Sequence, residues 1–423
     1  MEKVYLCIDL KSFYASVECV ERGLNPFTSN LVVADPSRGR GAICLAISPA
    51  MKNLGIKNRC RIFEIPDKLS YITAKPRMKL YMKYSADIYG IYLRYIAKED
   101  IYVYSVDECF FDVTSYLKLY NKTPVEIAKM LIDAVYNETG LCATSGIGTN
   151  LFIAKVAMDV VAKHQEPNEF GVRIAELDEM SYRKEIWNHK PITDIWNVGK
   201  GIANRLRKYG IDDLYGVAHI DEKILYKEFG VNAQFLIDHA KGIEPCTIAD
   251  IHNYVPQSAS VSTGQILFED YSYDDALIVL KEMIEPLVLE IVEKNLVTNS
   301  ISLYVGYSKN ITKSTGGTVK LENFTSSLKK ITDDFISYYI KTTQKGYPIR
   351  KLNIGLNNLI EEEFTAIDLF SDYAAEEKER DRLKVLIDIR EKFGKNAVLK
   401  GISLNKKATA RVRNKMVGGH NGE

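Results

Sequence analysis

The sequence predicts an α+β protein of several domains. With 423 residues, the chain is longer than a single hydrophobic core usually supports. At about residues 4–163 and 255–356, short apolar runs with strand character alternate with segments of helical periodicity. Between these regions lie short helical segments separated by glycines. We therefore expect two mixed regions of strands and helices, with a helical region between them.

The first mixed region is expected to hold a sheet with helices around it. Strands are predicted at residues 4–9, 101–106 and 143–147, and helices at 12–20, 81–96, 124–139 and 151–163. Within residues 25–75 we expect a strand at 30–34 and a helix around 50–54. Many bases and a Gly-Arg-Gly loop in that segment indicate a small mobile lobe rather than part of the core.

The later regions differ from the first. After Pro167 short helices and glycine turns follow, and the run from Asn197 to Ala203 fits a helix-hairpin-helix. In that motif, free N–H groups at a helix start can bind a phosphate, although an ordinary turn between two helices would also fit. From Val255 a strand, a helix (273–294), a strand (300–307), a helix (328–342) and a strand (349–356) alternate. This order is typical of a split βαβ domain.

Composition excludes several classes of protein. The chain is 46% hydrophobic and 26% charged, which is ordinary for a soluble protein. No run of 18 apolar residues could span a membrane, and the start of the chain does not resemble a signal peptide. The seven cysteines form no C-x-x-C pair. We therefore expect a cytoplasmic protein with no membrane partner, no zinc site and no disulfide framework.

Charge is balanced over the whole chain but not locally. The net charge is +1, yet residues 306–351 carry nine Lys and Arg against three acids. Residues 361–382 carry nine acids against three bases, and residues 400–423 carry six bases against one acid. This order predicts a polyanion-binding domain followed by an acidic spacer and a basic interaction tail. Each stretch alone would also fit the solvated face of a helix.

Three carboxylates stand at the ends of two predicted strands. Asp9 closes the strand 4–9, and Asp107 and Glu108 follow the strand 101–106. If these strands pair side by side, the three side chains meet at one edge of the sheet and repel each other. Such a cluster is stable when cations bind it, which is the arrangement that two-metal phosphoryl transfer requires. A solvated hairpin turn is the simpler explanation of Asp107 and Glu108 alone.

Four segments resemble the Y-family, lesion-bypass DNA polymerases. Residues 9–18 (DLKSFYASVE) are similar to the opening motif of that family, and residues 105–113 (SVDECFFDV) to its catalytic hairpin. Residues 146–163 and 261–265 resemble the end of its palm and the start of its little finger. The helix-hairpin-helix also lies where the family's thumb has one. Residues 46–50 (AISPA) and the motifs at 408–420 are most similar to the UmuC-like proteins of Gram-positive bacteria.

The resemblance implies a right-hand polymerase. Its palm would comprise residues 1–24 and 76–165, its fingers 25–75, its thumb 166–245, its little finger 246–358 and its C-terminal tail 359–423. In the palm, Asp9, Asp107 and Glu108 would bind two Mg²⁺ ions, with Leu10 adding its backbone carbonyl. We interpret Asp112, beyond the hairpin, as a structural acid that accepts hydrogen bonds.

The resemblance also assigns residues to the incoming nucleotide. Tyr14 matches the aromatic residue that excludes a 2′-hydroxyl, and Lys163 matches a lysine that binds the triphosphate. Phe13 would lie near the same sugar, or would be a core aromatic residue. Many members have a Tyr and an Arg in the finger helix where this chain has Ser48 and Met51. Ser48 could still donate a hydrogen bond, and Lys52, Arg59 or Arg61 could replace the missing charge.

DNA and protein partners complete the expectations. Val198, Gly199 and Gly201 of the helix-hairpin-helix, with Lys309 and Lys313 of the basic stretch, would bind the DNA backbone without reading its sequence. In the acidic spacer, Ala366 and the apolar Ile367, Leu369 and Phe370 resemble a sliding-clamp peptide. A small helix packed on the little finger would fit those residues too. The basic tail would bind DNA, the recombinase filament or no partner.

The sequence therefore predicts a template-directed DNA polymerase of the lesion-bypass type that adds dNMPs from dNTPs to a primer. A catalytically inactive scaffold that binds DNA and the clamp is the alternative, and loss of the three acids would mark it. Another palm-type enzyme, such as a nucleotide cyclase, would have no use for the helix-hairpin-helix or the basic stretch.

Overall fold

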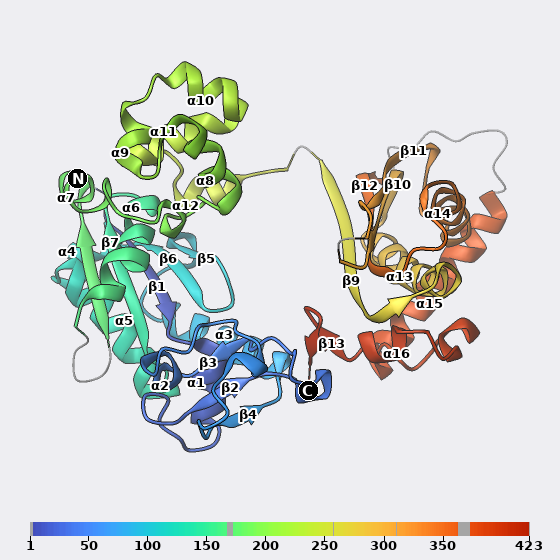
Figure 1. Cartoon of the computed structure of the whole chain (residues 1–423), viewed down its shortest axis with the longest axis horizontal. Helices are drawn as coiled ribbons and strands as arrows, with labels where there is room; N and C mark the ends of the chain where they lie inside the picture. Colours follow the sequence, from blue (N-terminus) through green and yellow to red (C-terminus); the bar gives the residue numbers. More distant parts are fainter. Residues whose placement is uncertain (1–2, 167–171, 257, 310, 363–372, 423) are drawn as a thin grey trace. The chain divides into compact units, whose positions relative to one another are not determined.

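A computed structural model describes residues 3–166, 172–256, 258–309, 311–362 and 373–422 (Figure 1). The chain divides into two compact units, residues 1–254 and 255–422. Each unit has its own sheets and hydrophobic core. The mixed α+β character and the several domains predicted from the sequence are confirmed.

A five-stranded sheet forms the centre of the first unit. Its strand order is β5 (Ile101–Val103), β6 (Glu108–Asp112), β1 (Tyr5–Leu10), β7 (Ala143–Gly148) and β8 (Arg173–Leu177). β1 is antiparallel to both of its neighbours, whereas β7 and β8 are parallel. The two predicted strands 4–9 and 101–106 therefore do not pair with each other. The neighbour of β1 is β6, which begins at Glu108, and β5 lies outside it.

Helices bury the central strands of this sheet. α5 (Pro124–Thr139) and α6 (Leu151–Val156) both pack on β1 and β7, and α3 (Met78–Tyr92) packs on α5. Every residue of β7 is buried, as expected for a strand covered on both faces. The predicted helix 151–163 is not regular, because α6 continues as a π-helical turn (Ala157–Val161) and a 3₁₀ turn (Ala162–His164).

The segment predicted as a small lobe has its own sheet and a small core. β2 (Leu31–Val33) lies between β3 (Ala46–Ile47) and β4 (Ile72–Ala74), and α2 (Pro49–Asn53) follows β3. The expectation that this segment has no core was wrong. Its core side chains come from widely spaced positions that share no periodicity: Val32, Ala34, Cys44, Ile47, Met51, Cys60 and Ile65.

The predicted helical region follows β8. Its helices are α7 (Glu179–Ile186), α8 (Lys200–Leu206), α9 (Leu214–His219), α10 (Glu222–Phe229), α11 (Ala233–Lys241) and α12 (Ile248–Asn253). α7 to α11 share one hydrophobic cluster with Phe152 of α6, whose ring stacks on His239 at 4.0 Å between centroids. Ile248 of α12 packs instead in a cluster with Tyr5 and Phe110 of the central sheet. The ring nitrogen Nε2 of His252 lies 3.0 Å from the carbonyl oxygen of Ile101. α12 therefore belongs to the first unit.

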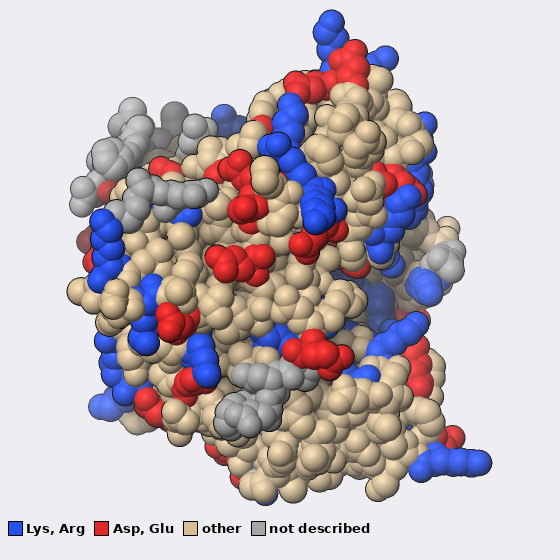
Figure 2. Space-filling model, turned by 90° about the vertical axis from the view of Figure 1, so that its left-hand side faces the viewer, with Lys and Arg blue, Asp and Glu red and all other residues tan. Residues whose placement is uncertain are grey.

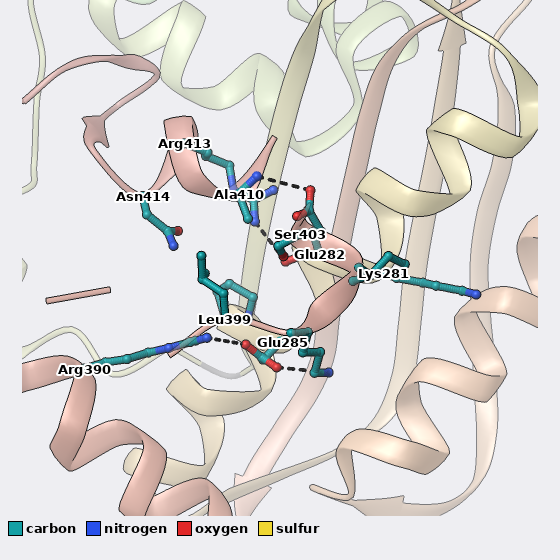
Figure 3. Close-up of a pocket in the computed structure, with 12 residues that line it drawn as sticks. Lys281, Glu282, Glu285, Arg390, Leu399, Ser403, Ala410, Arg413 and Asn414 are labelled. Atoms are coloured by element: carbon teal, nitrogen blue, oxygen red, sulfur yellow. Dashed lines mark hydrogen bonds and ion pairs between the residues drawn. The ribbon is translucent and has the colours of Figure 1, made fainter. Parts of the chain in front are cut away.

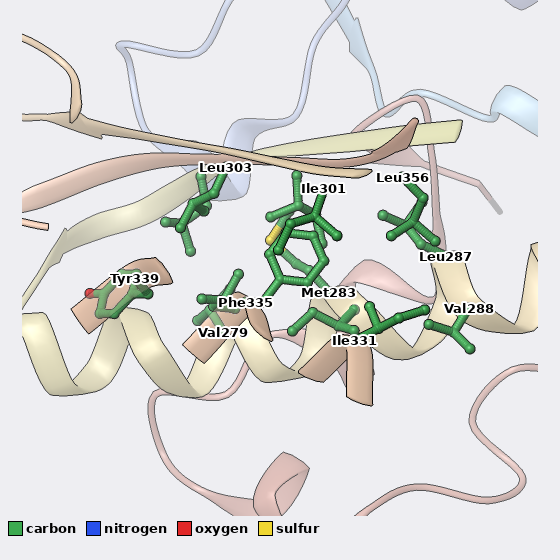
Figure 4. Close-up of a cluster of buried hydrophobic side chains, with 14 of the residues drawn as sticks. Val279, Met283, Leu287, Val288, Ile301, Leu303, Ile331, Phe335, Tyr339 and Leu356 are labelled. Atoms are coloured by element: carbon green, nitrogen blue, oxygen red, sulfur yellow. The ribbon is translucent and has the colours of Figure 1, made fainter. Parts of the chain in front are cut away.

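The second unit contains a four-stranded antiparallel sheet. Its order is β11 (Thr315–Thr325), β10 (Leu296–Tyr307), β12 (Ile349–Glu361) and β9 (Ala259–Tyr271). The helices α13 (Tyr273–Glu293) and α14 (Leu328–Thr342) pack against this sheet, and the side chains of Met283, Phe335 and Ile301 meet between them (Figure 4). We did not expect β11, because it lies at an edge of the sheet and only two of its residues are buried.

The described part of the C-terminal tail is folded onto the second unit. α15 (Tyr373–Phe393) packs on α13, where Leu383 joins the core. Two glutamates of α13 bind the following segment (Figure 3). Glu282 accepts backbone hydrogen bonds from Thr409 (2.7 Å) and Ala410 (3.1 Å), and Glu285 pairs with Arg390 and Lys400. Residues 373–422 are therefore part of this unit rather than a free tail.

A substitution of Gly146 tests how closely the helices pack on the sheet. A Cβ at Gly146 of β7 would lie 2.1 Å from the carbonyl oxygen of Ala154. We expect Gly146→Ala to lower the free energy of unfolding of the first unit by about 3 kcal/mol. Gly90, in an exposed position of α3 with open space around it, is the control. Gly90→Ala should be neutral or stabilise by up to about 1 kcal/mol. Equal midpoints for both variants in urea unfolding would contradict this packing.

Candidate active site

Asp9 and Glu108 face each other across two neighbouring strands. They are Cα partners in the antiparallel register of β1 and β6. Asp107 precedes Glu108, and its carbonyl oxygen accepts a hydrogen bond from the N–H of Leu10 at 2.9 Å. Because cross-strand partners point to the same face of a sheet, Asp9 and Glu108 lie side by side at the end of β1. The hairpin holds Asp107 next to them.

The electrostatics of this edge show that the acids repel one another. The pKa of Asp9 is raised from 3.8 to about 7. Burial is the largest cause, and the charges of Asp107 and Glu108 add to it. Lys155 and Lys163 act in the opposite direction. Burial also raises the pKa of Glu108, against the charge of Lys155. Three carboxylates that destabilise each other's charge are a donor set suited to divalent cations.

Two of the three acids, Glu108 and Asp107, also have protein partners. The ammonium of Lys155 lies 2.7 Å from Glu108 and 2.9 Å from Asp159, and the thiol of Cys7 donates to Glu108 at 3.2 Å. Ser105 donates to Asp107 at 2.7 Å. Among the described residues, no three His, Cys, Asp or Glu side chains converge on a common ligand position. In this structure, Glu108 and Asp107 are therefore oriented by Lys155, Cys7 and Ser105.

Lys155 has a central position that we did not predict. Its side chain is buried and crosses between the helix and the sheet, with its ammonium 5.9 Å from the ring centroid of Tyr104. Burial lowers its pKa, but the charges of Cys7, Asp159 and Glu108 outweigh burial and raise it. The sequence did contain one indication of this role, because Lys155 and Asp159 are four residues apart in a predicted helix and can therefore pair.

The predicted aromatic residues lie at the start of α1 (Phe13–Val20). Ser12 has a left-handed backbone, with φ 51°, so the chain turns from β1 directly into the helix. The ring of Tyr14 is half-buried and stacks on Tyr81, with 4.5 Å between centroids. Burial and then the charge of Asp107 raise the pKa of Tyr14, which places its hydroxyl near the acids. Phe13 is buried, which fits the alternative interpretation that it is an aromatic residue of the core.

A buried carboxylate holds Tyr81 behind Tyr14. The hydroxyl of Tyr81 donates to Glu18 at 2.7 Å, and Arg77 donates to the same carboxylate through Nε (2.9 Å) and Nη2 (2.8 Å). Glu18 has no exposed surface, and although burial raises its pKa, these hydrogen bonds lower it below its usual value. The stack on Tyr14 is thus fixed by a charge-assisted network.

Cationic side chains surround the acids. Lys163 pairs with Asp159 at 3.1 Å and stays 56% exposed. Burial lowers the pKa of Lys52. The charge of Asp9 acts against burial, and the charge of Lys163 acts with it. The charge of Arg59 lowers the pKa of Tyr14. Lys163 is linked to the acids through Asp159 and Lys155, and the role of Lys52 and Lys163 toward a nucleotide stays a prediction.

Ser48 does not lie at the site as expected. It is fully buried, its hydroxyl donates to the carbonyl oxygen of Ser29 at 2.8 Å and it accepts from the N–H of Leu31 at 3.2 Å. Met51 is buried in the same small core. Arg61 donates to the carbonyl oxygen of Gly41. The hydroxyl of Ser48 serves as the cap of α2 and has no free hydrogen for a nucleotide.

The other predicted residues lie away from this edge. Gly199 is the N-cap of α8 and is exposed, as is Gly201, whereas Val198 is buried. Lys309 and Lys313 are exposed between β10 and β11 of the second unit. Asp112 accepts hydrogen bonds from Lys3 (2.7 Å) and from Thr114, so its structural role is confirmed. Ala366, Ile367, Leu369 and Phe370 lie outside the described residues.

The surface shows no single sign of charge on the face in Figure 2. Acidic and basic side chains are interspersed there over a largely uncharged surface. This agrees with the overall net charge of +1. Among the described residues, no helix is both long enough and apolar enough to cross a membrane.

Comparison with known proteins assigns the family. Residues 8–159 match the impB/mucB/samB family model, and residues 258–369 match the model of its C-terminal domain. The chain belongs to this family. The chain is also similar to "Putative UV-damage repair protein UvrX" of Bacillus subtilis, with 31% identity over 99% of this chain and 97% of that protein. "DNA polymerase IV 2" of Bacillus subtilis is 30% identical over 99% of each chain.

A solved structure supports the fold. "Y-family DNA polymerase chimera Dbh-Dpo4(243-245)-Dbh" superposes with a TM-score of 0.63 at 20% identity, over 85% of this chain and 99% of that one. The resemblance to Y-family DNA polymerases drawn from the sequence is thus confirmed, together with the α+β polymerase fold.

The raised pKa of Asp9 predicts how stability depends on pH. Between about pH 4 and 7, native Asp9 keeps a proton that the unfolded chain has already lost. The free energy of unfolding therefore falls as the pH rises through this window and is level above it. Asp9→Asn removes this dependence, so in chelator the variant should gain on the order of 2 kcal/mol relative to wild type from pH 5 to pH 8.

The control for this prediction is Asp87→Asn, which changes an exposed acid on α3 of the same unit. Its urea unfolding should follow the wild-type pH profile. If Asp9→Asn follows that profile too, Asp9 does not carry the raised pKa.

Proposed function

We infer that the chain is a DNA-directed DNA polymerase of the lesion-bypass type, which adds dNMPs from dNTPs to a primer 3′-hydroxyl on a DNA template. The observation that carries this is the pairing of Asp9 with Glu108 beside Asp107, in a chain of the Y-family. The relative named for UV-damage repair supports a role on damaged DNA.

The acids fit the divalent ions that such enzymes use. The charges of two neighbouring carboxylates raise the pKa of buried Asp9, and such a set of oxygen donors suits a hard cation. We propose two Mg²⁺ ions held by Asp9, Asp107, Glu108 and the carbonyl of Leu10. When bound, these ions supply activation of the primer hydroxyl and neutralisation of the phosphates. Lys155 balances the charge of Glu108 before binding, and Asp159 keeps Lys155 in place. The thiol of Cys7 donates to Glu108 as well.

Side chains around the acids would position the nucleotide. The flat ring of Tyr14, held by Tyr81, would lie under the sugar beside Asp107 and would leave no room for a 2′-hydroxyl. Lys52 and Lys163 would bind the triphosphate as point charges. Positioning and charge neutralisation are the main contributions of a protein to phosphoryl transfer, so no side-chain nucleophile is needed.

The remaining assignments follow from the family resemblance. Residues 1–24 and 76–165 would be the palm, 25–75 the fingers, 166–245 the thumb and 246–358 the little finger. Val198, Gly199, Gly201, Lys309 and Lys313 would bind primer–template DNA without sequence specificity. Ile367, Leu369 and Phe370 would bind the sliding clamp, and the C-terminal segment would bind DNA or the recombinase filament. An inactive scaffold is not favoured, because all three acids are present.

Primer extension tests the proposed activity. Wild type should extend an undamaged primer–template with Mg²⁺ and dNTPs, and Asp107→Ala/Glu108→Ala should lose at least about 1,000-fold in rate, because the phosphate charge is no longer neutralised. Asp87→Ala, an exposed acid of the same unit, should extend normally. Extension by the double variant at the wild-type rate would refute the assignment of the site. No extension by wild type, even with clamp and recombinase filament, would favour the scaffold.

Substitution of Tyr14 tests sugar selection. Tyr14→Ala should raise the efficiency of rNTP relative to dNTP incorporation by about 100-fold, because the flat ring no longer occupies the space of the 2′-hydroxyl. Tyr14→Phe keeps the ring and should keep the discrimination. The measurement is kcat/KM for matched dNTP and rNTP. Unchanged discrimination in Tyr14→Ala would show that another group selects the sugar.

A further inference from the structure

Four side chains form one row across the sheet of the first unit. Asp9 is the partner of Glu108 on one side and of Thr144 on the other, and Thr144 is the partner of Arg173. Because such partners point to the same face, the row runs from the two acids to a hydroxyl and then to a base. Arg173 is the first residue of β8, two strand spacings or roughly 10 Å from Asp9.

Arg173 has unused hydrogen-bonding capacity. Its Nε is buried and has no hydrogen-bond partner among the described residues. No described acidic side chain forms an ion pair with it. A guanidinium cannot lose its charge, and a buried donor without a partner is costly. Such a group is suited to an anionic ligand that binds from outside.

Lys11 lies beside Arg173. Its N–H donates to the carbonyl oxygen of Cys142 at 2.8 Å, which extends the pairing of β1 and β7 by one residue. Its ammonium lies 5.2 Å from the ring centroid of Phe27. Lys11 lies two residues beyond Asp9, so it continues the edge of the sheet at which the row from Asp9 to Arg173 lies. Lys11, too, has no ion pair with an acid in the described part of the chain.

These cations repel one another unless a polyanion lies between them. The row from Asp9 to Arg173, with Lys11, therefore sets positive groups at the edge of the sheet beside the acids. Asp107 and Glu108 lie on the other side of β1, so the sugar of a bound nucleotide, proposed to lie between Tyr14 and Asp107, would be on that side of Asp9. The terminal phosphates would then extend toward Lys11 and Arg173.

The finger helix α2 provides no side chain for the terminal phosphate. Many relatives bind the triphosphate with a Tyr and an Arg there, but Ser48 and Met51 of this chain are buried in the core of residues 31–65. We propose that Arg173, with Lys11, forms the subsite for the terminal phosphate of the incoming nucleoside triphosphate. This assignment rests on the proposed function, because that function determines where the sugar lies relative to the three acids. Arg173 is a binding residue supplied by the sheet in place of one supplied by the fingers.

Binding of inorganic tripolyphosphate to the full chain tests the subsite without catalysis. In chelator, measured by titration calorimetry, Arg173→Gln should weaken binding about 10-fold or more, because one charge-assisted contact is lost. Arg173→Lys should recover part of the loss. Arg183→Gln, which removes an exposed arginine of α7, is the matched control and should bind as wild type. Arg183 donates to the carbonyl of Lys241 and lies over the ring of Trp187.

Steady-state kinetics provides the second measurement. Arg173→Gln should raise KM for dNTP about 10-fold, with little change in affinity for primer–template DNA. Lys11→Gln should act in the same direction, and it tests the proposal independently if Arg173→Gln fails to fold.

The outcomes separate this proposal from the proposed function. Unchanged tripolyphosphate affinity and KM in both variants would overturn the subsite, while the Asp107/Glu108 result would still decide the polymerase. A specific loss of tripolyphosphate binding in a chain that extends no primer would support the subsite and refute the activity. An equal loss of tripolyphosphate affinity in Arg183→Gln would overturn the subsite, because the effect would then be one of general charge. If Arg173→Gln lost only affinity for DNA, Arg173 would be a DNA contact and the subsite would be overturned too.

Discussion

Mutual repulsion of carboxylates at the end of β1 is the constraint on which the site depends. The register of β1 and β6 sets Asp9 against Glu108, and burial adds to the cost of their charge. The surrounding structure offsets this cost with Lys155. That lysine reaches the sheet because α6 lies very close to β7, where Gly146 and Gly148 leave no space for a Cβ. Two glycines of β7 therefore determine where the positive charge lies.

The other wall of the site depends on a second buried charge. Glu18 has no exposed surface, and Arg77 and Tyr81 satisfy it with short hydrogen bonds. This network fixes the ring of Tyr81, and Tyr81 in turn limits the positions open to Tyr14. A polar network in which every member is satisfied is rigid. Rigidity is what a residue that selects by shape needs, since a ring that could rotate away would not exclude a hydroxyl.

The sequence was sufficient where function follows from local order. The three acids, Tyr14 and Lys163 lie in continuous motifs, and the helices 124–139 and 328–342 have clear periodicity and caps. Lys155, Lys11 and Arg173 could not be assigned in this way, because their roles depend on strand register and helix packing between distant segments. Ser48 was misplaced for a related reason: a hydroxyl can cap a helix or face a ligand, and the choice depends on the surrounding core.

Charge balance links these observations. The cations of the first unit fall into two groups, those paired with acids, such as Lys155, and those near the acids without an acidic partner among the described residues, such as Lys11 and Arg173. The first group stabilises the protein without ligand. The second group destabilises it until phosphate binds, so its contribution is greater in the complex than in the free protein. A chain without the finger Tyr and Arg thus keeps a cationic wall around its nucleotide site, built from the sheet.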